Sequence, residues 1–378
     1  MRNPGPRWFL VVLAVALNLL PLARLGSSSS TSQTFALPDS VSPGSSLPFF
    51  QEEFINPDAP QPMAHVSSIC ELPDGKLAAT WYAGSREGAP DVAIFFATSE
   101  PRQHAWSNPR TIVTPETAAR DSGRAVRKVG NALIFSDRAG KLWLVYVTIT
   151  IGGWSGSSLN LASSSDQGQS WTPGRRLTLS PFFNLSELVK NGPVRLSGSG
   201  WAVPIYHELV GKFPELLWLD HAGESKSRIA GGSAGFQPAL VALSTNDALA
   251  FLRDTTSRRR ISMAHSHDAG RSWSAPEVID FPNPDSGLDA VRLADGRLLL
   301  AFNDSASGRE NLRLALSTDN ARTWRRVATI AQQAGAEFSY PFLLQTRDGN
   351  IHLVYTWKRK AIKHAVFNPA WLAAGGAS

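Results

Sequence analysis

The chain has 378 residues, of which 43% are hydrophobic and 18% charged, a composition typical of a folded globular protein and unlike that of a disordered one. Its formal net charge of +6 is spread thinly and forms no concentrated basic stripe, so no nucleic-acid partner is expected. A single cysteine, Cys70, excludes an internal disulfide and a cysteine-based metal cluster.

The N-terminal segment has the pattern of an export signal. Arg2 and Arg7 precede an apolar run from Trp8 to Leu22, which is roughly 15 residues long. The run is short for a membrane span, and no sharp cleavage site follows it. Residues 1–26 are therefore interpreted as a signal peptide or an N-terminal membrane anchor. Either interpretation places the rest of the chain outside the cytoplasm, whether periplasmic, secreted or held at the membrane.

A Ser-rich stretch follows the export signal. The composition of residues 27–51 is typical of a flexible linker. Over residues 52–378, short apolar runs alternate with turn signals, and no amphipathic helix stands out. A single domain built from β-strands is predicted there.

Hairpin turns recur along this domain at intervals of roughly 50 to 60 residues. Each turn contains Asp, Gly, Ser or Asn and precedes a strand-like run. The turns are Pro73–Gly75, Arg138–Gly140, Ser197–Gly200, Thr245–Asp247, Ala294–Gly296 and Arg347–Gly349. Six such units fit four-stranded blades around an axis, so the predicted fold is all-β, a six-bladed β-propeller. A β-sandwich or β-helix is the alternative, but sandwiches do not repeat at this period.

A second motif repeats between these turns. Ser266–Trp273 contains Ser, Asp, Gly and Trp at fixed spacing, and close copies lie at Ser164–Trp171 and Ser317–Trp324. Asp and Ser side chains bond nearby backbone groups, and Gly adopts a positive φ at no steric cost. The motif is interpreted as a structural turn with a buried Trp beneath it.

The innermost strands of a propeller line its axis, and side chains near their first residues converge on one cavity. These positions lie a few residues before each hairpin turn and are nearly all polar. They are His65, Asn131, Asn191, Gln237, Asp289 and Tyr340.

These features resemble the sialidase (neuraminidase) superfamily, and most closely its bacterial members with BNR, or Asp-box, repeats. The likeness extends from Pro62 to Leu372. It is strongest in Trp81–Ile94, Asn283–Val291, Ser339–Pro341 and Tyr355–His364. The resemblance implies a sialidase-type propeller and an exo-acting glycosidase that needs no cofactor.

Sialidases hold a substrate carboxylate with three arginines, protonate the leaving group with an Asp, and use a Tyr activated by a Glu as nucleophile. The resemblance assigns the nucleophile to Tyr340 and the acid to Asp91. It also assigns two of the three arginines, Arg253 and Arg309. The polar loop around Asp91 is interpreted as functional. The substrate-binding candidates are His65, Arg86, Glu87, Arg253 and Arg309.

Two positions depart from the family pattern. His65 stands where the first arginine is expected, and it would be cationic only below its reference pKa of about 6.5. Gln237 stands where the activating Glu is expected, and an amide cannot accept the proton of the phenol. Another base is then needed, for example Glu337, Glu215 or Asp289.

We therefore predict an exported, sialidase-like glycosidase that acts on an acidic sugar of a glycan or polysaccharide, with sialic acid itself disfavoured by the two departures. The alternatives are a non-catalytic propeller that binds a polysaccharide and a uronic-acid-directed lyase that uses Tyr340 and a His. There is no HExxH motif and no Cys/His cluster, so no metal is expected. We expect a monomer whose partner is the glycan, with a membrane tether only if the N-terminal segment is retained.

Overall fold

The structure is a computed structural model that describes residues 33–39, 41, 47–58, 60–100, 105–180, 184–221, 223–230 and 235–376. The predicted export segment, residues 1–26, lies outside these ranges. Within them, no helix has the length and the apolar character needed to cross a membrane.

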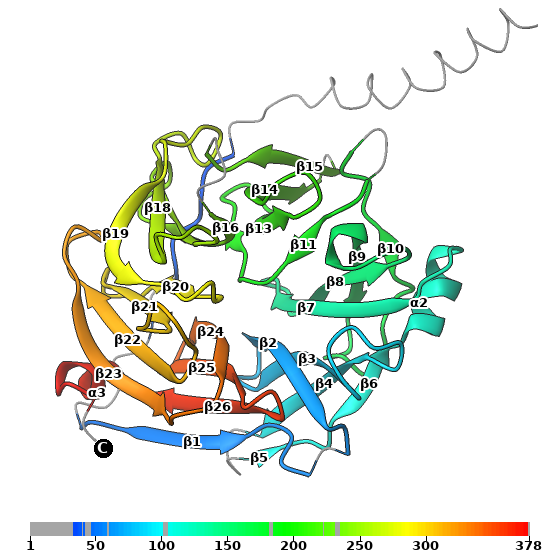
Figure 1. The fold of residues 1–378 in the computed structure, drawn as a ribbon, viewed down its shortest axis with the longest axis horizontal. Coiled ribbons are helices and arrows are strands. Elements are labelled where there is room, and N and C mark those ends of the chain that lie inside the picture. Colours follow the sequence, from blue (N-terminus) through cyan, green and yellow to red (C-terminus); the bar gives the residue numbers. More distant parts are fainter. Residues whose placement is uncertain are drawn as a thin grey trace, which may run out of the picture.

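The strands form six antiparallel sheets set around a central axis, which confirms the predicted six-bladed β-propeller (Figure 1). Buried apolar side chains fill the space between neighbouring blades. Blade 1 contains β2 (Met63–Glu71), β3 (Leu77–Gly84), β4 (Ala93–Glu100), β5 (Ala105–Trp106) and β6 (Arg110–Val113), and blade 2 contains β7 (Lys128–Ser136), β8 (Leu142–Ile149), β9 (Ser157–Ser164) and β10 (Arg175–Arg176). Blade 3 contains β11 (Leu188–Val189), β12 (Val194–Arg195), β13 (Trp201–His207), β14 (Phe213–Asp220) and β15 (Gly223–Arg228).

The remaining blades have four strands each. Blade 4 contains β16 (Phe236–Ala242), β17 (Ala248–Arg253), β18 (Arg260–Ser266) and β19 (Glu277–Pro282), and blade 5 contains β20 (Asp289–Arg292), β21 (Leu298–Phe302), β22 (Asn311–Ser317) and β23 (Arg325–Gln332). Blade 6 contains β24 (Phe338–Gln345), β25 (Ile351–Trp357), β26 (Ala361–Phe367) and β1 (Phe50–Phe54). The short helices are α2 (Pro115–Ser122), α3 (Pro369–Ala373) and the 3₁₀ turn η1 (Trp154–Gly156).

All six predicted hairpin turns lie between strands. In five blades the turn joins the innermost strand to the second strand. In blade 3 it joins β12 to β13, because the inner strand is split into β11 and β12, which both pair with β13. The sequence signal was reliable because each turn is encoded by its own few residues.

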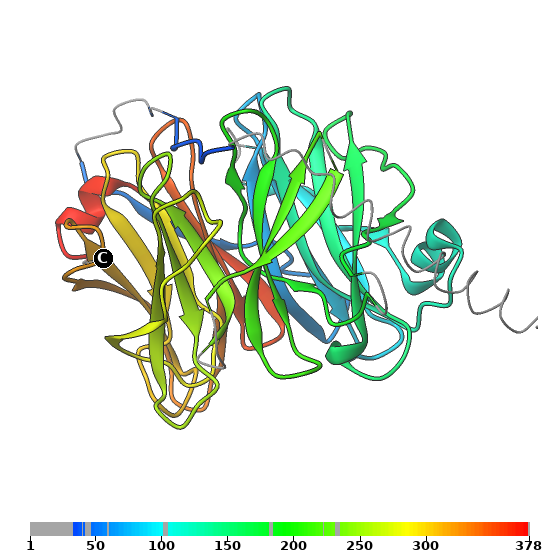
Figure 2. The same cartoon turned by 90° about the horizontal axis from the view of Figure 1, so that it is seen from above.

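The N-terminal strand closes the propeller. β1 pairs with β26 and completes the last blade, with Phe50 opposite Phe367. Further upstream, Phe35 is fully buried and forms a bridge with Leu196, and this segment runs along one face of the disc (Figure 2). The prediction that the domain begins at residue 52 is therefore corrected, because part of the stretch taken as a linker packs on the propeller.

The repeated turn motif has the predicted structural role. Oδ1 of Asp268 accepts hydrogen bonds from Ser266 Oγ at 2.9 Å and from the Ser272 amide at 2.8 Å. The copies at Asp166 and Asp319 make the same set of bonds. The Trp side chains of all three copies are half-buried rather than buried as predicted.

Candidate functional site

Four inner strands are interrupted by a β-bulge near their first residues, where the register with the second strand shifts. The bulges lie between His65 and Ser68, Gly130 and Ala132, Phe236 and Ala239, and Ser339 and Phe342. In three of them one residue has a positive φ: Val66 at 47°, Gln237 at 48° and Tyr340 at 53°. A positive φ is strained for such residues and is retained where a strand re-aims a side chain at a functional site.

Val66, and not His65, occupies the place in β2 that corresponds to Gln237 and Tyr340. His65 is fully buried, with Nδ1 at 3.0 Å from Thr356 Oγ1 and its ring edge-on to Tyr340 at 4.7 Å. Burial, and then the nearby Arg359, lower the pKa of His65 to about 3. His65 is therefore neutral at physiological pH, which contradicts its predicted role as a cationic member of the carboxylate clamp.

Acidification is expected to destabilise the fold through His65. Its folded-state pKa of about 3 lies below the unfolded value of 6.5, so the unfolded chain binds more protons between these pH values. The contribution of His65 to the free energy of unfolding is therefore complete above pH 6.5. Below that pH it falls by roughly 1.4 kcal/mol per pH unit. Urea unfolding at several pH values should show a shallower dependence in His65→Gln than in wild type or in a control at the exposed His221. Equal slopes in all three proteins would contradict this account.

A chain of side-chain bonds links the blades at this end of the axis. Glu87, in the loop after β3, accepts from Arg359 of the β25–β26 turn at 2.6 Å. The same guanidinium donates to Glu337 at 2.8 Å, and Glu337 accepts from Arg309 at 3.2 Å. Arg309 also donates to the backbone carbonyl of Asp285 at 2.8 Å. Blades 1, 6 and 5 are thus joined by alternating charges.

The chain of bonds continues through the other three blades. The carboxylate of Asp285 accepts from Nε of Arg253 at 2.7 Å, and Nη1 of Arg253 donates to Gln237 Oε1 at 2.8 Å. The amide nitrogen of Gln237 donates to Tyr206 OH at 3.0 Å, and Asn131 Nδ2 donates to the same hydroxyl at 3.1 Å. Blades 4, 3 and 2 are therefore part of one polar network with Tyr340 beside it.

Tyr340 lies between the two predicted clamp arginines. Nη1 of Arg253 is 3.4 Å from the phenol oxygen, and Cζ of Arg309 lies 5.6 Å from the ring centroid. Tyr340 is half-buried, so its ring remains accessible. A Cβ atom on Gly287 would lie 3.0 Å from Cδ1 of Tyr340, so a side chain at this position would crowd the ring.

Both arginines keep hydrogen-bond donors for a ligand. A guanidinium carries five N–H groups. Among the contacts of the described residues, Nη2 of Arg253 and Nε of Arg309 have no hydrogen-bond partner. A carboxylate that enters beside Tyr340 can therefore be bound without breaking the network.

Asp91, the predicted acid, is differently placed. Its side chain is exposed, and its two oxygens accept from the backbone amide and the hydroxyl of Ser85 at 2.9 and 2.8 Å. The hydroxyl bond lowers the pKa of Asp91, whereas a general acid must hold its proton near neutral pH. These contacts disfavour the acid role. Arg86 is also exposed, while Glu87 is half-buried and belongs to the charged network.

Among the described contacts, none of the three predicted bases forms a hydrogen bond with the phenol oxygen of Tyr340. Burial alone would raise the pKa of Glu337, but bonds from Ser339 and Arg359 outweigh it and lower the pKa to about 2. Glu215 is bonded to Lys226 on the neighbouring strand of blade 3. Asp289 accepts the amide of Leu343 at 2.7 Å deeper in the axis, where burial raises its pKa to about 6.

Glu208 is a carboxyl group that the sequence reasoning missed. It follows β13, two residues after Tyr206, and its charge interacts with those of Arg253 and Asp285 in the polar network. Burial raises the pKa of Glu208, although the charges of Lys212 and Arg253 lower it in part. The signal available in the sequence was a Tyr-x-Glu pattern at the end of a strand, which is too common to single out.

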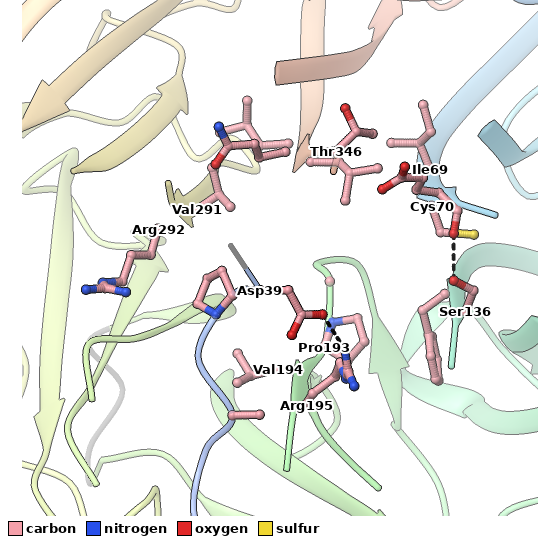
Figure 3. A pocket seen from close by; sticks show the side chains of 18 of the residues that line it. Asp39, Ile69, Cys70, Ser136, Pro193, Val194, Arg195, Val291, Arg292 and Thr346 are labelled. Atoms are coloured by element: carbon pink, nitrogen blue, oxygen red, sulfur yellow. Dashed lines mark hydrogen bonds and ion pairs between the residues drawn. The ribbon is translucent and has the colours of Figure 1, made fainter. Parts of the chain in front are cut away.

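A cavity of about 430 Å³ lies at the other end of the inner strands. Its wall includes residues next to the hairpin turns, and Asp39 of the N-terminal segment lies beside it and bonds Arg195 at 3.2 Å (Figure 3). Asp39 also bonds Arg138 at 3.0 Å. The cavity is therefore separate from the polar network around Tyr340.

Comparisons with known proteins agree with the architecture. The family model described as a BNR repeat-like domain matches residues 75–353. A protein of unknown function from Dyadobacter fermentans has a TM-score of 0.69 and 14% identity, with 85% of this chain and 100% of that one covered. A "Hadza microbial sialidase" has a TM-score of 0.68 and 16% identity, with 80% and 65% covered. The NanB sialidase of Streptococcus pneumoniae has a TM-score of 0.65 and 14% identity, with 85% and 70% covered. No curated protein matches the chain.

Proposed function

The chain belongs to the BNR repeat-like family of sialidase-like propellers, and from this we propose that it is an exported glycosidase acting on an acidic sugar of a glycan or polysaccharide. The observation that carries the proposal is the position of Tyr340, whose phenol lies between the guanidinium groups of Arg253 and Arg309. Export is supported by the pattern of residues 1–26.

Recognition of the acid group is assigned to the two arginines. Planar guanidinium groups bind carboxylates with paired, charge-assisted hydrogen bonds. Asp285 holds both of them, through its carboxylate to Arg253 and its carbonyl to Arg309. The donors are therefore fixed before a sugar arrives, which lowers the entropic cost of binding.

Bond cleavage is assigned to Tyr340. Its oxygen bonds to the anomeric carbon while the glycosidic C–O bond breaks, and the electron pair of that bond goes to the leaving oxygen. The phenol loses one proton and the leaving oxygen gains one. Glu208, a part-buried carboxyl group whose pKa is raised by burial, is assigned to carry it. Water then cleaves the bond between sugar and Tyr340.

The lyase alternative also has an observation in its favour. His65 is neutral and buried, its ring meets that of Tyr340 at 4.7 Å, and its Nε2 has no hydrogen-bond partner among the described residues. A neutral His next to a Tyr is suited to removing a carbon-bound proton beside a uronic acid carboxylate. The sugar is then released by elimination, without water, and an unsaturated product forms.

A product analysis of the purified protein distinguishes these functions. It should be incubated with glycans that end in acidic sugars, with uronic-acid polysaccharides and with neutral glycans as controls. A released acidic monosaccharide that takes up oxygen from labelled water would support the proposal. An unsaturated product would replace it with the lyase, and tight binding without cleavage would replace it with the polysaccharide-binding propeller.

The role of Glu208 is tested by Glu208→Gln, which keeps the shape of the side chain but not its acid–base function. We expect kcat to fall by about 10²- to 10⁴-fold, the usual contribution of a general acid–base. Asp91→Asn is the matched control and is expected to cost much less. If Asp91→Asn lowered kcat more than Glu208→Gln did, the acid role would return to Asp91.

A further inference from the structure

The inner strand of blade 3 is broken beneath the proposed site. β11 ends at Val189 and β12 begins at Val194. Between them, Lys190 is 2% exposed and Asn191 is 1% exposed. A lysine buried this deeply loses its hydration, so its ammonium group must be compensated by polar partners.

The segment Val189–Asn191 bonds three of the four bulges. The carbonyl of Val189 accepts from Asn131 Nδ2 at 3.0 Å. Nζ of Lys190 donates to the carbonyl of Pro341 at 2.5 Å, and Asn191 Nδ2 donates to the carbonyl of Pro238 at 2.9 Å. A bulge removes backbone groups from the strand ladder, so the carbonyls of Pro341 and Pro238 need other donors. Lys190 and Asn191, which are consecutive residues of blade 3, supply those donors to blades 6 and 4.

Lys190 uses all three of its N–H donors. Besides Pro341, it donates to Asn191 Oδ1 at 2.5 Å and to the carbonyl of Leu288 at 2.9 Å. Leu288 follows Gly287, where an added Cβ would meet the ring of Tyr340. The ammonium group therefore holds the bulge that carries Tyr340 and the segment that packs on its ring.

We propose that Lys190 is a positioning residue, which fixes Tyr340 through the carbonyls of Pro341 and Leu288. Asn191 fixes the bulge of Gln237 in the same way. The two bulges are thereby held in register from one point on the axis. The effect on catalysis rests on the proposed function of Tyr340, whereas the effect on its geometry does not.

The positioning depends on the protonation of Lys190. Burial lowers its pKa to about 8, against the raising effect of Asp289 on β20, and Arg253 on β17 lowers it further. Loss of the proton leaves two N–H donors for three acceptors. Above pH 8, one of the three bonds is therefore lost, and the packing around Tyr340 should change.

Tyrosine-selective NMR measures this change directly. The chain has five tyrosines. Tyr340→Phe identifies the signal of Tyr340. In wild type, this ring signal should shift with an inflection near pH 8. In Lys190→Met the inflection should disappear, and kcat should fall about 10²-fold, as expected for a misplaced reacting group, with KM changed less than about threefold.

Two further variants separate positioning from general destabilisation. Lys226→Met removes another part-buried lysine of blade 3, which pairs with Glu187 and Glu215, and should leave the Tyr340 inflection unchanged. Lys190→Gln keeps two N–H donors, and should restore the ring signal in part without the inflection. It also serves as the test protein if Lys190→Met does not fold.

The outcomes are distinguishable. An unchanged inflection and kcat in both Lys190 variants would overturn the positioning role. A wild-type protein that neither binds nor cleaves any acidic glycan would overturn the proposed function. In that case the NMR inflection would still decide whether Lys190 positions Tyr340.

Discussion

Tyr340→Phe is expected to abolish cleavage while an acidic glycan still binds. The variant removes one oxygen, which forms the bond to the sugar only during the reaction. The guanidinium groups of Arg253 and Arg309, which bind the ground state, remain in place. We expect kcat to fall on the order of 10⁴-fold or more, as for other lost nucleophiles, and Kd to change less than about threefold. Single-turnover kinetics and calorimetry measure the two quantities.

Tyr355→Phe is the matched control for this variant. Tyr355 lies on β25 of the same blade, is fully buried, and its hydroxyl has no hydrogen-bond partner among the described residues. Its loss should leave kcat within about twofold. Full activity in Tyr340→Phe would remove the nucleophile assignment, and a large loss of binding would mean that the phenol acts in recognition instead.

The architecture was predictable because its signals are local. Each turn, such as Asp74–Gly75 or Asp348–Gly349, carries its own conformational preference, and regular spacing then counts the blades. The strand Phe50–Phe54 was missed for the opposite reason. It pairs with β26, more than three hundred residues away, and nothing in its few residues indicates that partner.

The site was predictable only in part. Gln237, Arg253, Arg309 and Tyr340 were identified, and the structure brings them together. Arg359 was missed, because it reaches the site from the turn between the second and third strands of blade 6 and not from an inner strand.

Lys190 and His65 show two other limits of the sequence. The residues around Lys190 give no indication that this lysine is buried on the axis. The environment of His65 was misjudged because its neutral state follows from burial and from Arg359, neither of which is visible in the neighbouring residues.

The charged network explains how the site can bind an anion although each arginine already has a partner. Glu337 lies between Arg309 and Arg359, and Asp285 lies between Arg309 and Arg253. Alternating charges hold every guanidinium in one orientation, and Arg253 and Arg309, which both contact Tyr340, each keep a donor that the network does not use. Fixed donors of this kind select a ligand by the position of its charge.

Arg309→Met is accordingly expected to remove the preference for an acidic sugar. Two ligands should be compared, an acidic sugar and its methyl ester, which differ in charge at the carboxyl group. Wild type should bind the acid more tightly, and the variant should lose roughly 30-fold or more in affinity for the acid, the range for a lost partner of a desolvated charge pair. Affinity for the ester should change little, because the ester carries no charge with which Arg309 could pair.

Arg326→Met controls for charge and fold. Arg326 lies on β23, the outer strand of the same blade, and bonds Asp304 at 2.7 Å. Its loss should leave both affinities unchanged, so that the difference between acid and ester isolates the interaction of Arg309 with the carboxylate. If Arg309→Met weakened the acid and the ester equally, the arginine would act through the shape of the site, and the carboxylate clamp would have to be assigned to Arg253 alone.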